Sequence, residues 1–334
     1  MRIAIDAMGG DFGPPVTVPA ALCSLARHPA LELVLIGAES QIAPLLGGVA
    51  AADRRRVSVR HCAEVVEMTD RPSHALRNKR QSSMRIAVDL LDRGDVAACV
   101  SAGNTGALMA IGYSVLKTAP GIDRPAICAS IPTRLGHSYL LDLGANVDNC
   151  PEHLRQFALM GTVLSQALDN VAEPRVMLLN IGEEVIKGNE QVRVAARLIE
   201  QDPRIHYTGY LEADRLFDGS ADVVVCDGFV GNVALKAVEG TARFIADKSS
   251  EVFRRSPAAR IIGWFARPLL RRLLAEVNPE AYNGAFFLGL RGVLVKSHGR
   301  ASANGFHLAI EKAIMTVENR MIEQLQYKLE VMAY

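Results

Sequence analysis

Short apolar runs alternate with longer amphipathic stretches along almost the whole chain. The apolar runs predict strands at Ile3–Ile5, Leu33–Ile36, Val57–Val59, Val96–Val100, Ala126–Ile131, Tyr139–Leu143, Val176–Leu179, Ile205–Thr208, Val223–Cys226 and Val293–Lys296. The amphipathic stretches predict helices at Pro15–Arg27, Ser82–Asp92, Ala107–Leu116, His153–Leu168, Glu190–Glu200, Val230–Asp247 and Asn304–Leu325. Continuous apolar strands alternating with helices indicate a mostly parallel sheet covered on both faces, an α/β fold with three α/β/α layers.

Local signals refine this pattern. Pro14-Pro15 and Pro151 predict helix starts, because proline is tolerated in the first turn. Ile127–Leu143 contains a Gly136 turn and predicts a hairpin. Neither a repeat, a low-complexity linker nor a shift in composition marks a boundary, so residues 1–334 are expected to form one domain.

Composition excludes several classes of protein. With 49% hydrophobic and 22% charged residues, the chain can bury a large core, and a net charge of +1 provides no global attraction for nucleic acid. The six cysteines are widely spaced and form no CxxC motif of the kind found in metal or redox sites. This spacing favours reduced thiols and a cytoplasmic protein. Asp6 interrupts the apolar run that a secretory signal peptide would need, so secretion is not expected. Val96–Leu116 is uncharged, but polar and glycine residues around Gly103 break it, so we expect a buried strand and helix rather than a membrane span.

The segment Ser101-Ala-Gly-Asn-Thr-Gly106 combines a strand end, a loop of small residues and a helix start. Backbone N–H groups at such a position lack partners within the helix, and the helix dipole adds partial positive charge. Phosphate is a natural occupant of this kind of site.

Similar loops recur at Asp6-Ala-Met-Gly-Gly-Asp11, Asn180-Ile-Gly-Glu-Glu184, Cys226-Asp-Gly-Phe-Val-Gly-Asn232 and Lys296-Ser-His-Gly299. If all of them follow parallel strands, they converge on one edge of the sheet. Each loop taken alone is also compatible with an ordinary strand-to-helix turn. Together they predict a site that handles phosphate.

A basic segment departs from the alternating pattern. Residues 254–272 contain six arginines and no acid, interleaved with the apolar residues Ile261, Ile262, Trp264, Phe265, Leu269 and Leu270. Gly263 and Pro268 argue against one straight helix, so we expect a helical arm at about residues 243–280. Such an arm suits an anionic membrane surface, and packing within a dimer is the alternative interpretation.

Six blocks carry a family resemblance: Asp6–Asp11, Ser101–Ala107, Leu141-Asp-Leu-Gly-Ala-Asn146, Asn180–Glu184 with Lys187-Gly-Asn189, Asp227–Asn232 and Lys296–Gly299. In this order they resemble the phosphate acyltransferases of bacterial phospholipid synthesis, the PlsX family, from Met1 to about Leu325. The resemblance implies a homodimer with the architecture of phosphotransacetylases and of isocitrate and isopropylmalate dehydrogenases. It also implies that acyl-[acyl-carrier protein] and inorganic phosphate give acyl phosphate and free carrier protein. A membrane glycerol-3-phosphate acyltransferase would then use the acyl phosphate, which places the enzyme in the cytoplasm and peripherally on the inner face of the cell membrane.

Attack of phosphate on a thioester requires an anion cradle and stabilisation of the tetrahedral oxyanion, but neither a protein nucleophile nor a cofactor. We expect the catalytic groups to be Lys187 as a point charge, Asn232 as a donor to the carbonyl oxygen, Asp227 as an orienting group and His298 as a candidate general acid. The predicted phosphate and substrate contacts are Asp6, Gly9, Gly10, Ser101, Gly103, Asn104, Thr105, Gly106, Asn146, Asn180, Asn189, Gly228 and Lys296.

Each assignment has a plainer alternative. Lys187 could be a solvated surface lysine, Asp227 and Asn232 could cap a helix, and His298 could be structural. Asp6, Asp11, Asp142 and Asp148 could be imagined as Mg²⁺ ligands, but turn and capping roles are preferred and no metal is expected.

The carrier protein is acidic as a class, so basic surface should meet it. Arg77, Lys79, Arg80 and Arg85 form one candidate cluster, with a solvated loop as the alternative, and the basic arm is another. Two rival functions remain open: a short-chain phosphotransacetylase that uses acyl-CoA, and a non-catalytic scaffold at the membrane. A dehydrogenase would need a GxGxxG fingerprint or a dense acidic cluster, and the sequence has neither.

Overall fold

A computed structural model describes residues 1–254, 266 and 282–330. The expected arm residues Ile261, Ile262, Trp264, Phe265, Leu269 and Leu270 lie outside this described part. The strands are β1 (Arg2–Asp6), β2 (Glu32–Gly37), β3 (Val57–His61), β4 (Ala98–Ser101), β5 (Ala126–Thr133), β6 (Gly136–Leu141), β7 (Arg175–Asn180), β8 (His206–Glu212), β9 (Val223–Val225), β10 (Ala285–Leu288) and β11 (Val293–Lys296). They form one sheet in the order β3-β2-β1-β4-β11-β10-β5-β6-β9-β7-β8.

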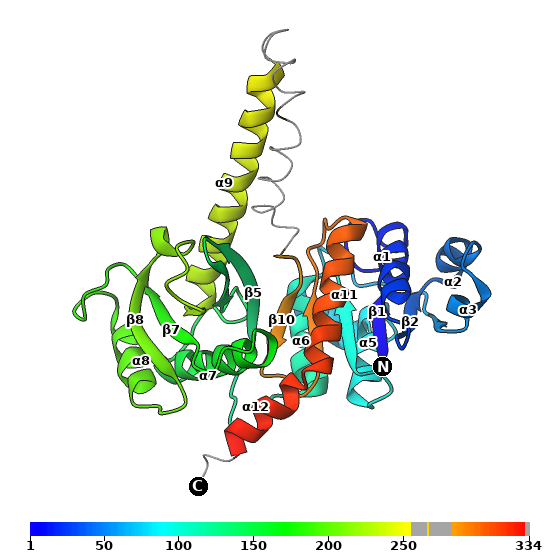
Figure 1. The fold of residues 1–334 in the computed structure, drawn as a ribbon. Coiled ribbons are helices and arrows are strands. Elements are labelled where there is room, and N and C mark those ends of the chain that lie inside the picture. The colour runs from blue at the N-terminus through cyan, green and yellow to red at the C-terminus, as the bar shows by residue number, and fades with distance from the viewer. Residues whose placement is uncertain (255–265, 267–281, 331–334) are drawn as a thin grey trace.

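Helices cover both faces of this sheet (Figure 1). They are α1 (Pro14–Arg27), α2 (Glu39–Ile42), α3 (Ala51–Arg54), α4 (Pro72–Asn78), α5 (Ser83–Asp92), α6 (Thr105–Leu116), α7 (Pro151–Leu168), α8 (Glu190–Glu200), α9 (Gly228–Arg254), α11 (Ala303–Glu318) and α12 (Met321–Glu330), with 3₁₀ turns η1 (Ala43–Leu46) and η2 (Ala213–Arg215). The expected α/β/α architecture is confirmed.

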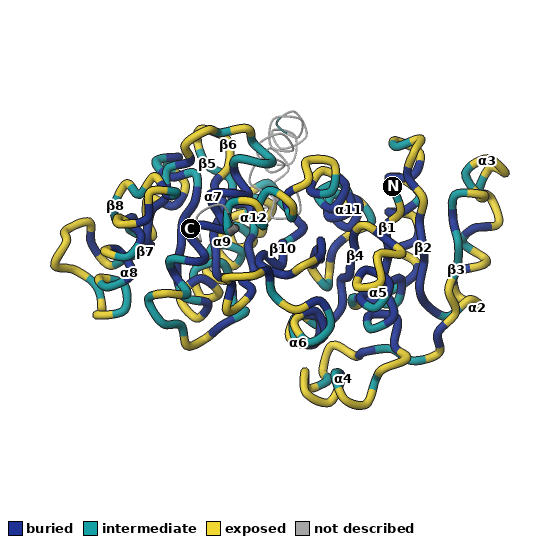
Figure 2. The backbone as a smooth tube through the Cα atoms, turned by 90° about the horizontal axis from the view of Figure 1, so that it is seen from below, coloured by how far each residue is buried: buried dark blue, intermediate teal, exposed yellow. Residues whose placement is uncertain are grey.

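Alternating strand residues fill two separate cores, since successive side chains point to opposite faces of a sheet. Ile3 and Ile5 of β1 pack with α1, α7 and α11 on one face. Ala4 packs with α5 and α6 on the other. Figure 2 shows the strands as a buried layer, with exposed segments around it.

The direction of the strands differs from the simplest prediction. The strand β10 was not predicted; it is antiparallel to both β11 and β5, and β5 is antiparallel to β6 in the predicted hairpin. Consequently β6, β9, β7 and β8 run opposite to the first five strands of the sheet. The prediction that all glycine-rich loops leave one sheet edge is therefore wrong, because periodicity along one strand does not reveal its direction.

Most predicted helices differ by one or two residues at their N-terminal end, and two differ by more. The predicted helix 304–325 is divided into α11 and α12 at Arg320, whose φ of 49° cannot continue a helix. The helix α9 is longer than predicted and projects from the body of the molecule (Figure 1). No helix within the described ranges is long and apolar enough to cross a membrane.

Candidate active site

The loops after β1, β4 and β11 pack against one another. The Ser101 hydroxyl donates to Oδ2 of Asp6 at 2.6 Å and accepts from the backbone N–H of Gly103 at 3.0 Å. A Cβ at Gly9 would lie 2.8 Å from the nitrogen of Gly103, so the two loops approach too closely for a side chain there. The β11 loop joins them through a bond from the backbone N–H of Ser297 to the carbonyl of Ser101, 2.9 Å.

Two buried ionisable side chains lie beneath these loops. Asp6 is 1% exposed and Lys296 is 7% exposed. Burial raises the pKa of Asp6, opposed mainly by the Ser101 hydrogen bond. Burial also lowers the pKa of Lys296 to about 8, and its ammonium donates to the carbonyl of Ala102 at 3.2 Å. Oδ1 of Asp6 is buried and has no hydrogen-bond partner among the described residues. Asp6 and Lys296 therefore shape the loops from below rather than reaching solvent.

The N-terminus of α6 is the exposed part of this region. Oδ1 of Asn104 caps the helix by accepting from the backbone N–H of Ala107 at 3.0 Å. Thr105 and Gly106 are exposed, and their backbone N–H groups have no partner within the described chain. These donors, together with the helix dipole, form an electropositive position suited to an anion.

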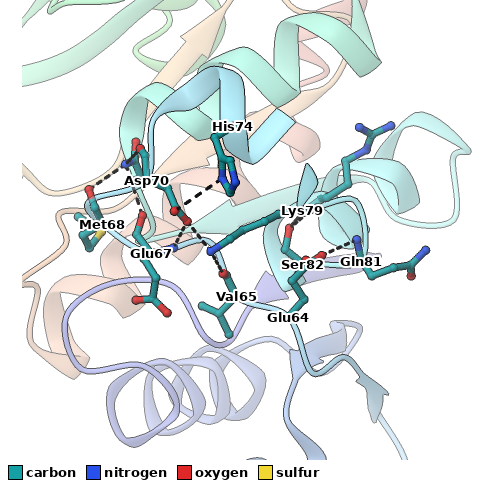
Figure 3. A network of polar contacts seen from close by, with 11 residues as sticks. Glu64, Val65, Glu67, Met68, Asp70, His74, Lys79, Gln81 and Ser82 are labelled. Carbon is teal, nitrogen blue, oxygen red and sulfur yellow. Dashed lines mark hydrogen bonds and ion pairs between the residues drawn. The ribbon is translucent and has the colours of Figure 1, made fainter. Parts of the chain in front are cut away.

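The side-chain amide of Asn104 is already used. Its Nδ2 donates to the carbonyls of Met68 at 2.8 Å and Asp70 at 3.0 Å. Figure 3 shows the network that extends from there, in which Lys79 donates to Oδ2 of Asp70 at 2.6 Å and to the carbonyl of Val65 at 2.7 Å. The hydrogen bond from Lys79 lowers the pKa of Asp70. Asn104 thus clamps residues 64–82 against the α6 loop, a role that the sequence analysis missed.

In the second half of the sheet, Asp142 organises the loop after β6. Its carboxylate accepts from the backbone N–H groups of Ile127, Gly144, Ala145 and Asn146 at 2.8–3.2 Å. The Asn146 side-chain amide donates to Oδ2 of Asp142 at 3.0 Å and to the carbonyl of Pro125 at 2.8 Å. Burial raises the pKa of Asp142, and these hydrogen bonds oppose that effect. Asp142 and Asn146 therefore brace the loop.

The start of α9 packs directly on this braced loop. Oδ1 of Asp227 accepts from the backbone N–H groups of Phe229 and Val230, both at 3.0 Å, so Asp227 caps the helix. The backbone N–H of Gly228 donates to the carbonyl of Asn146 at 3.0 Å. Asn232 is exposed and lies over Gly144, and within the described chain its amide has no hydrogen-bond partner. The amide of Asn232 is consequently available to a substrate, whereas the carboxylate of Asp227 is already hydrogen-bonded to the helix start.

The loop after β7 stands apart from both groups. Nδ2 of Asn180 donates to the carbonyls of Gly182 at 3.1 Å and Lys187 at 3.3 Å, which holds the loop closed. Asn189 caps α8 by accepting from the backbone N–H of Val192 at 2.9 Å. The Lys187 side chain is exposed, lies against Gly182 and has no ion-pair partner in the described ranges. Lys187 therefore remains a free cation on a fixed loop.

Charged residues of the helix α9 lie close enough to His298, in the loop after β11, to affect its pKa. Packing around the imidazole lowers the pKa of His298, although the residue keeps an exposed side; Glu239 of α9 raises it, and Lys236 and Arg243 lower it. Nδ1 of His298 accepts from the backbone N–H of Arg300 at 3.2 Å. Asn283, which the sequence analysis did not select, accepts from the backbone N–H of His298 at 2.9 Å.

The structure thus separates the sequence candidates into three sets. The first contains Asp6, Gly9, Gly10, Ser101, Gly103, Asn104, Thr105, Gly106, Lys296 and His298; the second contains Asn146, Asp227, Gly228 and Asn232; the third contains Asn180, Lys187 and Asn189. The described residues show no group of three or more His, Cys, Asp or Glu side chains placed to hold a metal ion. The exposed donors of the three sets can bind an anion and polarise a carbonyl.

Comparisons of sequence with known proteins give full-length matches. A family model described as "Fatty acid synthesis protein" matches residues 1–324. A phosphate acyltransferase of Pseudomonas fluorescens is 53% identical over 328 residues, which cover 98% of this chain and 97% of that protein. A phosphate acyltransferase of Stutzerimonas stutzeri is 54% identical over 98% of this chain and 92% of its own length.

Solved structures with this fold are more distant in sequence. A phosphotransacetylase from Streptococcus pyogenes has a TM-score of 0.62 at 18% identity, covering 97% of this chain and 94% of that one. A branched-chain phosphotransacylase from Enterococcus faecalis has a TM-score of 0.58 at 15% identity, covering 95% and 99%. At such identities the likeness describes the fold alone.

Proposed function

The chain belongs to the phosphate acyltransferases of the fatty acid synthesis protein family, and we propose from this premise that its substrates are a long-chain acyl-[acyl-carrier protein] and inorganic phosphate. The products are acyl phosphate and free carrier protein, which supply phospholipid synthesis. The observation that carries the proposal is the identity of 53% to a phosphate acyltransferase over nearly the full length of both chains. The rival short-chain and scaffold functions have no comparable support.

Phosphate binds, in this proposal, at the N-terminus of α6. The exposed N–H groups of Thr105 and Gly106 donate to its oxygens, and Asn104 holds the loop in place. Asp6, Ser101 and Lys296 act indirectly, because they are buried beneath the loop.

A phosphate oxygen then attacks the thioester carbonyl carbon and the carbonyl oxygen becomes an oxyanion. Asn232 is the proposed donor to this oxygen and Lys187 the proposed source of positive charge, since both side chains are exposed and without hydrogen-bond partners in the described structure. The loop of Lys187 stands apart from the α6 loop, so its contact with the oxyanion is part of the proposal and not an observed proximity. Collapse of the tetrahedral species breaks the carbon–sulfur bond and expels the carrier thiolate. The lowered pKa of His298 leaves its ring largely neutral at pH 7, so the thiolate takes its proton from solvent rather than from a cationic His298.

The purified protein tests this function directly. Incubated with long-chain acyl-[acyl-carrier protein] and phosphate, it should release the free thiol and an acyl phosphate that hydroxylamine traps as a hydroxamate. Omission of phosphate is the control. Turnover of acetyl-CoA in place of the carrier-protein substrate would instead indicate a phosphotransacetylase, and no turnover of any thioester would favour the scaffold.

We further propose that the protein is a homodimer and attaches to anionic membranes through the arm that begins with α9. The described part of α9 projects from the body and exposes Phe244, Ile245 and Val252 beside basic residues. Vesicle sedimentation should show binding to anionic vesicles that weakens with salt. The double variant Trp264→Ala with Phe265→Ala should bind these vesicles more weakly while its activity in solution persists. Unchanged vesicle binding would instead favour packing of the arm within a dimer.

A further inference from the structure

A groove of about 450 Å³ separates α4 from α6 and is lined by Leu76, Ala110, Tyr113, Ser114, Lys117 and Thr118. The two helices lie side by side, and most of α4 is exposed (Figure 2). Tyr113 is 48% exposed, an unusual fraction for an aromatic ring next to the apolar Leu76 and Ala110. An exposed aromatic residue in a partly apolar groove is typical of a protein interface.

The two helices that line the groove, α4 and α6, contain no acid, and basic residues lie on or next to them. Arg71, Arg77, Arg80 and Lys117 are exposed, and none has an ion-pair partner among the described residues. The sequence contains no Asp or Glu at 71–88, 96–122 or 281–310, the segments that include α4, α6 and the exposed Arg291. The acid just before α4, Asp70, is neutralised by Lys79 (Figure 3). Of the basic cluster expected from sequence, Lys79 and Arg85 are paired with carboxylates and Arg77 and Arg80 are free.

The groove also leads to the candidate active site. At 1.5 Å per residue, Ala110 and Lys117 lie about 8 Å and about 18 Å along α6 from Thr105. At the other end of α4, Pro72 packs against Gly106 of the α6 loop. A thioester on a flexible arm that enters along this groove would therefore reach the proposed phosphate position.

We propose that the α4–α6 groove is the docking surface for the small acidic protein that carries the acyl thioester, an inference that rests on the function proposed above. An acidic helix of that protein lies against Arg77, Arg80 and Lys117, and Tyr113 forms the apolar anchor. Charge complementarity of this kind steers association and fixes the register of the two partners. The groove is concave and neither α4 nor α6 contains an acid, which matches a compact anionic partner.

The double variant Arg77→Glu with Arg80→Glu tests the docking surface. We expect the KM for acyl-[acyl-carrier protein] to rise about 10-fold or more, with kcat and the KM for phosphate unchanged, because rim charges act mainly on association. Turnover of an acyl-pantetheine thioester, which has no protein part, should be unaffected. The matched control is Arg55→Glu with Arg60→Glu, two equally exposed arginines near and on β3.

A direct measurement keeps the inference independent of turnover. Isothermal titration with carrier protein should show binding to the wild type that weakens with salt, and about 10-fold weaker binding to the double variant and to Tyr113→Ser. Equal affinity of variant and wild type would contradict the docking surface. So would an equal rise in KM for acyl-pantetheine, or a change in oligomeric state on sedimentation, which would make the groove an interface between copies. Failure of wild-type turnover with all thioesters would contradict the proposed function, while the titration would still decide on docking.

Discussion

At the ends of β1 and β11, Asp6 and Lys296 are buried and bonded to protein, whereas in the region formed by the segments after β6, β7 and β9 the side chains of Lys187 and Asn232 are exposed. Asp6 and Lys296 contact Ser101 and the carbonyl of Ala102. Lys187 and Asn232 are exposed and have no such partners in the described chain. Burial of a polar group costs free energy of folding unless the group is hydrogen-bonded. The buried side chains of the first region are therefore bonded to the loops and hold their backbone N–H donors in place.

The second region also uses a buried carboxylate, but it adds exposed side chains. Its buried carboxylate, Asp142, fixes the backbone of its loop with four N–H donors, and the exposed Asn232 is placed over that fixed loop. The comparison indicates that the first region offers backbone groups to a substrate and the second offers side chains. Substitutions of the exposed side chains of the second region should therefore affect turnover without affecting stability, whereas substitutions of the bonded side chains in either region should affect stability.

The largest effect is expected at Lys187. Lys187→Ala should lower kcat about 10³-fold with an unchanged melting temperature, because an exposed charge is lost and no packing changes. Lys187→Arg should recover only part of the rate, since a planar fork replaces a compact charge. Steady-state phosphorolysis measures both, with the exposed Lys248→Ala as control. Near wild-type turnover of the alanine variant would make Lys187 an ordinary surface lysine.

The next effect is expected at Asn232. Asn232→Ala should lower kcat about 10²-fold at constant stability, because one donor to the oxyanion disappears. Val233→Ala, a neighbouring exposed position without a polar group, is the matched control. By contrast, Asn146→Ala should lower the free energy of unfolding by about 1–3 kcal/mol, because buried partners are left unsatisfied. If the Asn146 variant were stable but slow, or the Asn232 variant unstable, the assignment of Asn232 to turnover and of Asn146 to stability would be wrong.

A smaller and mixed effect is expected at Asn104. Asn104→Ala should raise the KM for phosphate about 10-fold and lower stability by about 1 kcal/mol, because both the helix cap and the clamp on residues 67–70 are lost. Asn104→Asp keeps the cap acceptor but removes the amide donors. Ser302→Ala removes the side-chain cap of α11 and should leave the phosphate KM unchanged. Unaltered phosphate kinetics in both Asn104 variants would remove this loop from the phosphate site.

A pH dependence of stability is expected at Lys296, with no direct effect on the chemical step. Because burial lowers its native pKa to about 8, the unfolded chain keeps this proton to higher pH than the native state does. The free energy of unfolding of the wild type should therefore rise relative to that of Lys296→Met between about pH 8 and pH 10.5, by roughly 3 kcal/mol in total. Below pH 8 the difference should be constant. Urea unfolding across this range measures it, and parallel curves would show that Lys296 is not buried as a cation.

The sequence by itself determined the strands other than β10, most helices, the hairpin and the positions of the glycine-rich loops. These features follow from local periodicity, proline and glycine, which act within a few residues. The six family blocks also identified the enzyme class, because each block combines uncommon residues in a fixed order.

Only the tertiary structure decided which polar residues are free. The strand β10 lies between β11 and β5 and is antiparallel to both, so β5 runs in the direction of β1. The antiparallel pairing of β5 with β6 then places β6, β9, β7 and β8 opposite to β1. The clamp from Asn104 to Met68 and the brace from Asp142 to Ile127 join residues distant in sequence. Composition cannot distinguish a bonded asparagine such as Asn104 from a free one such as Asn232, because hydrogen-bond satisfaction depends on neighbours that only folding brings together.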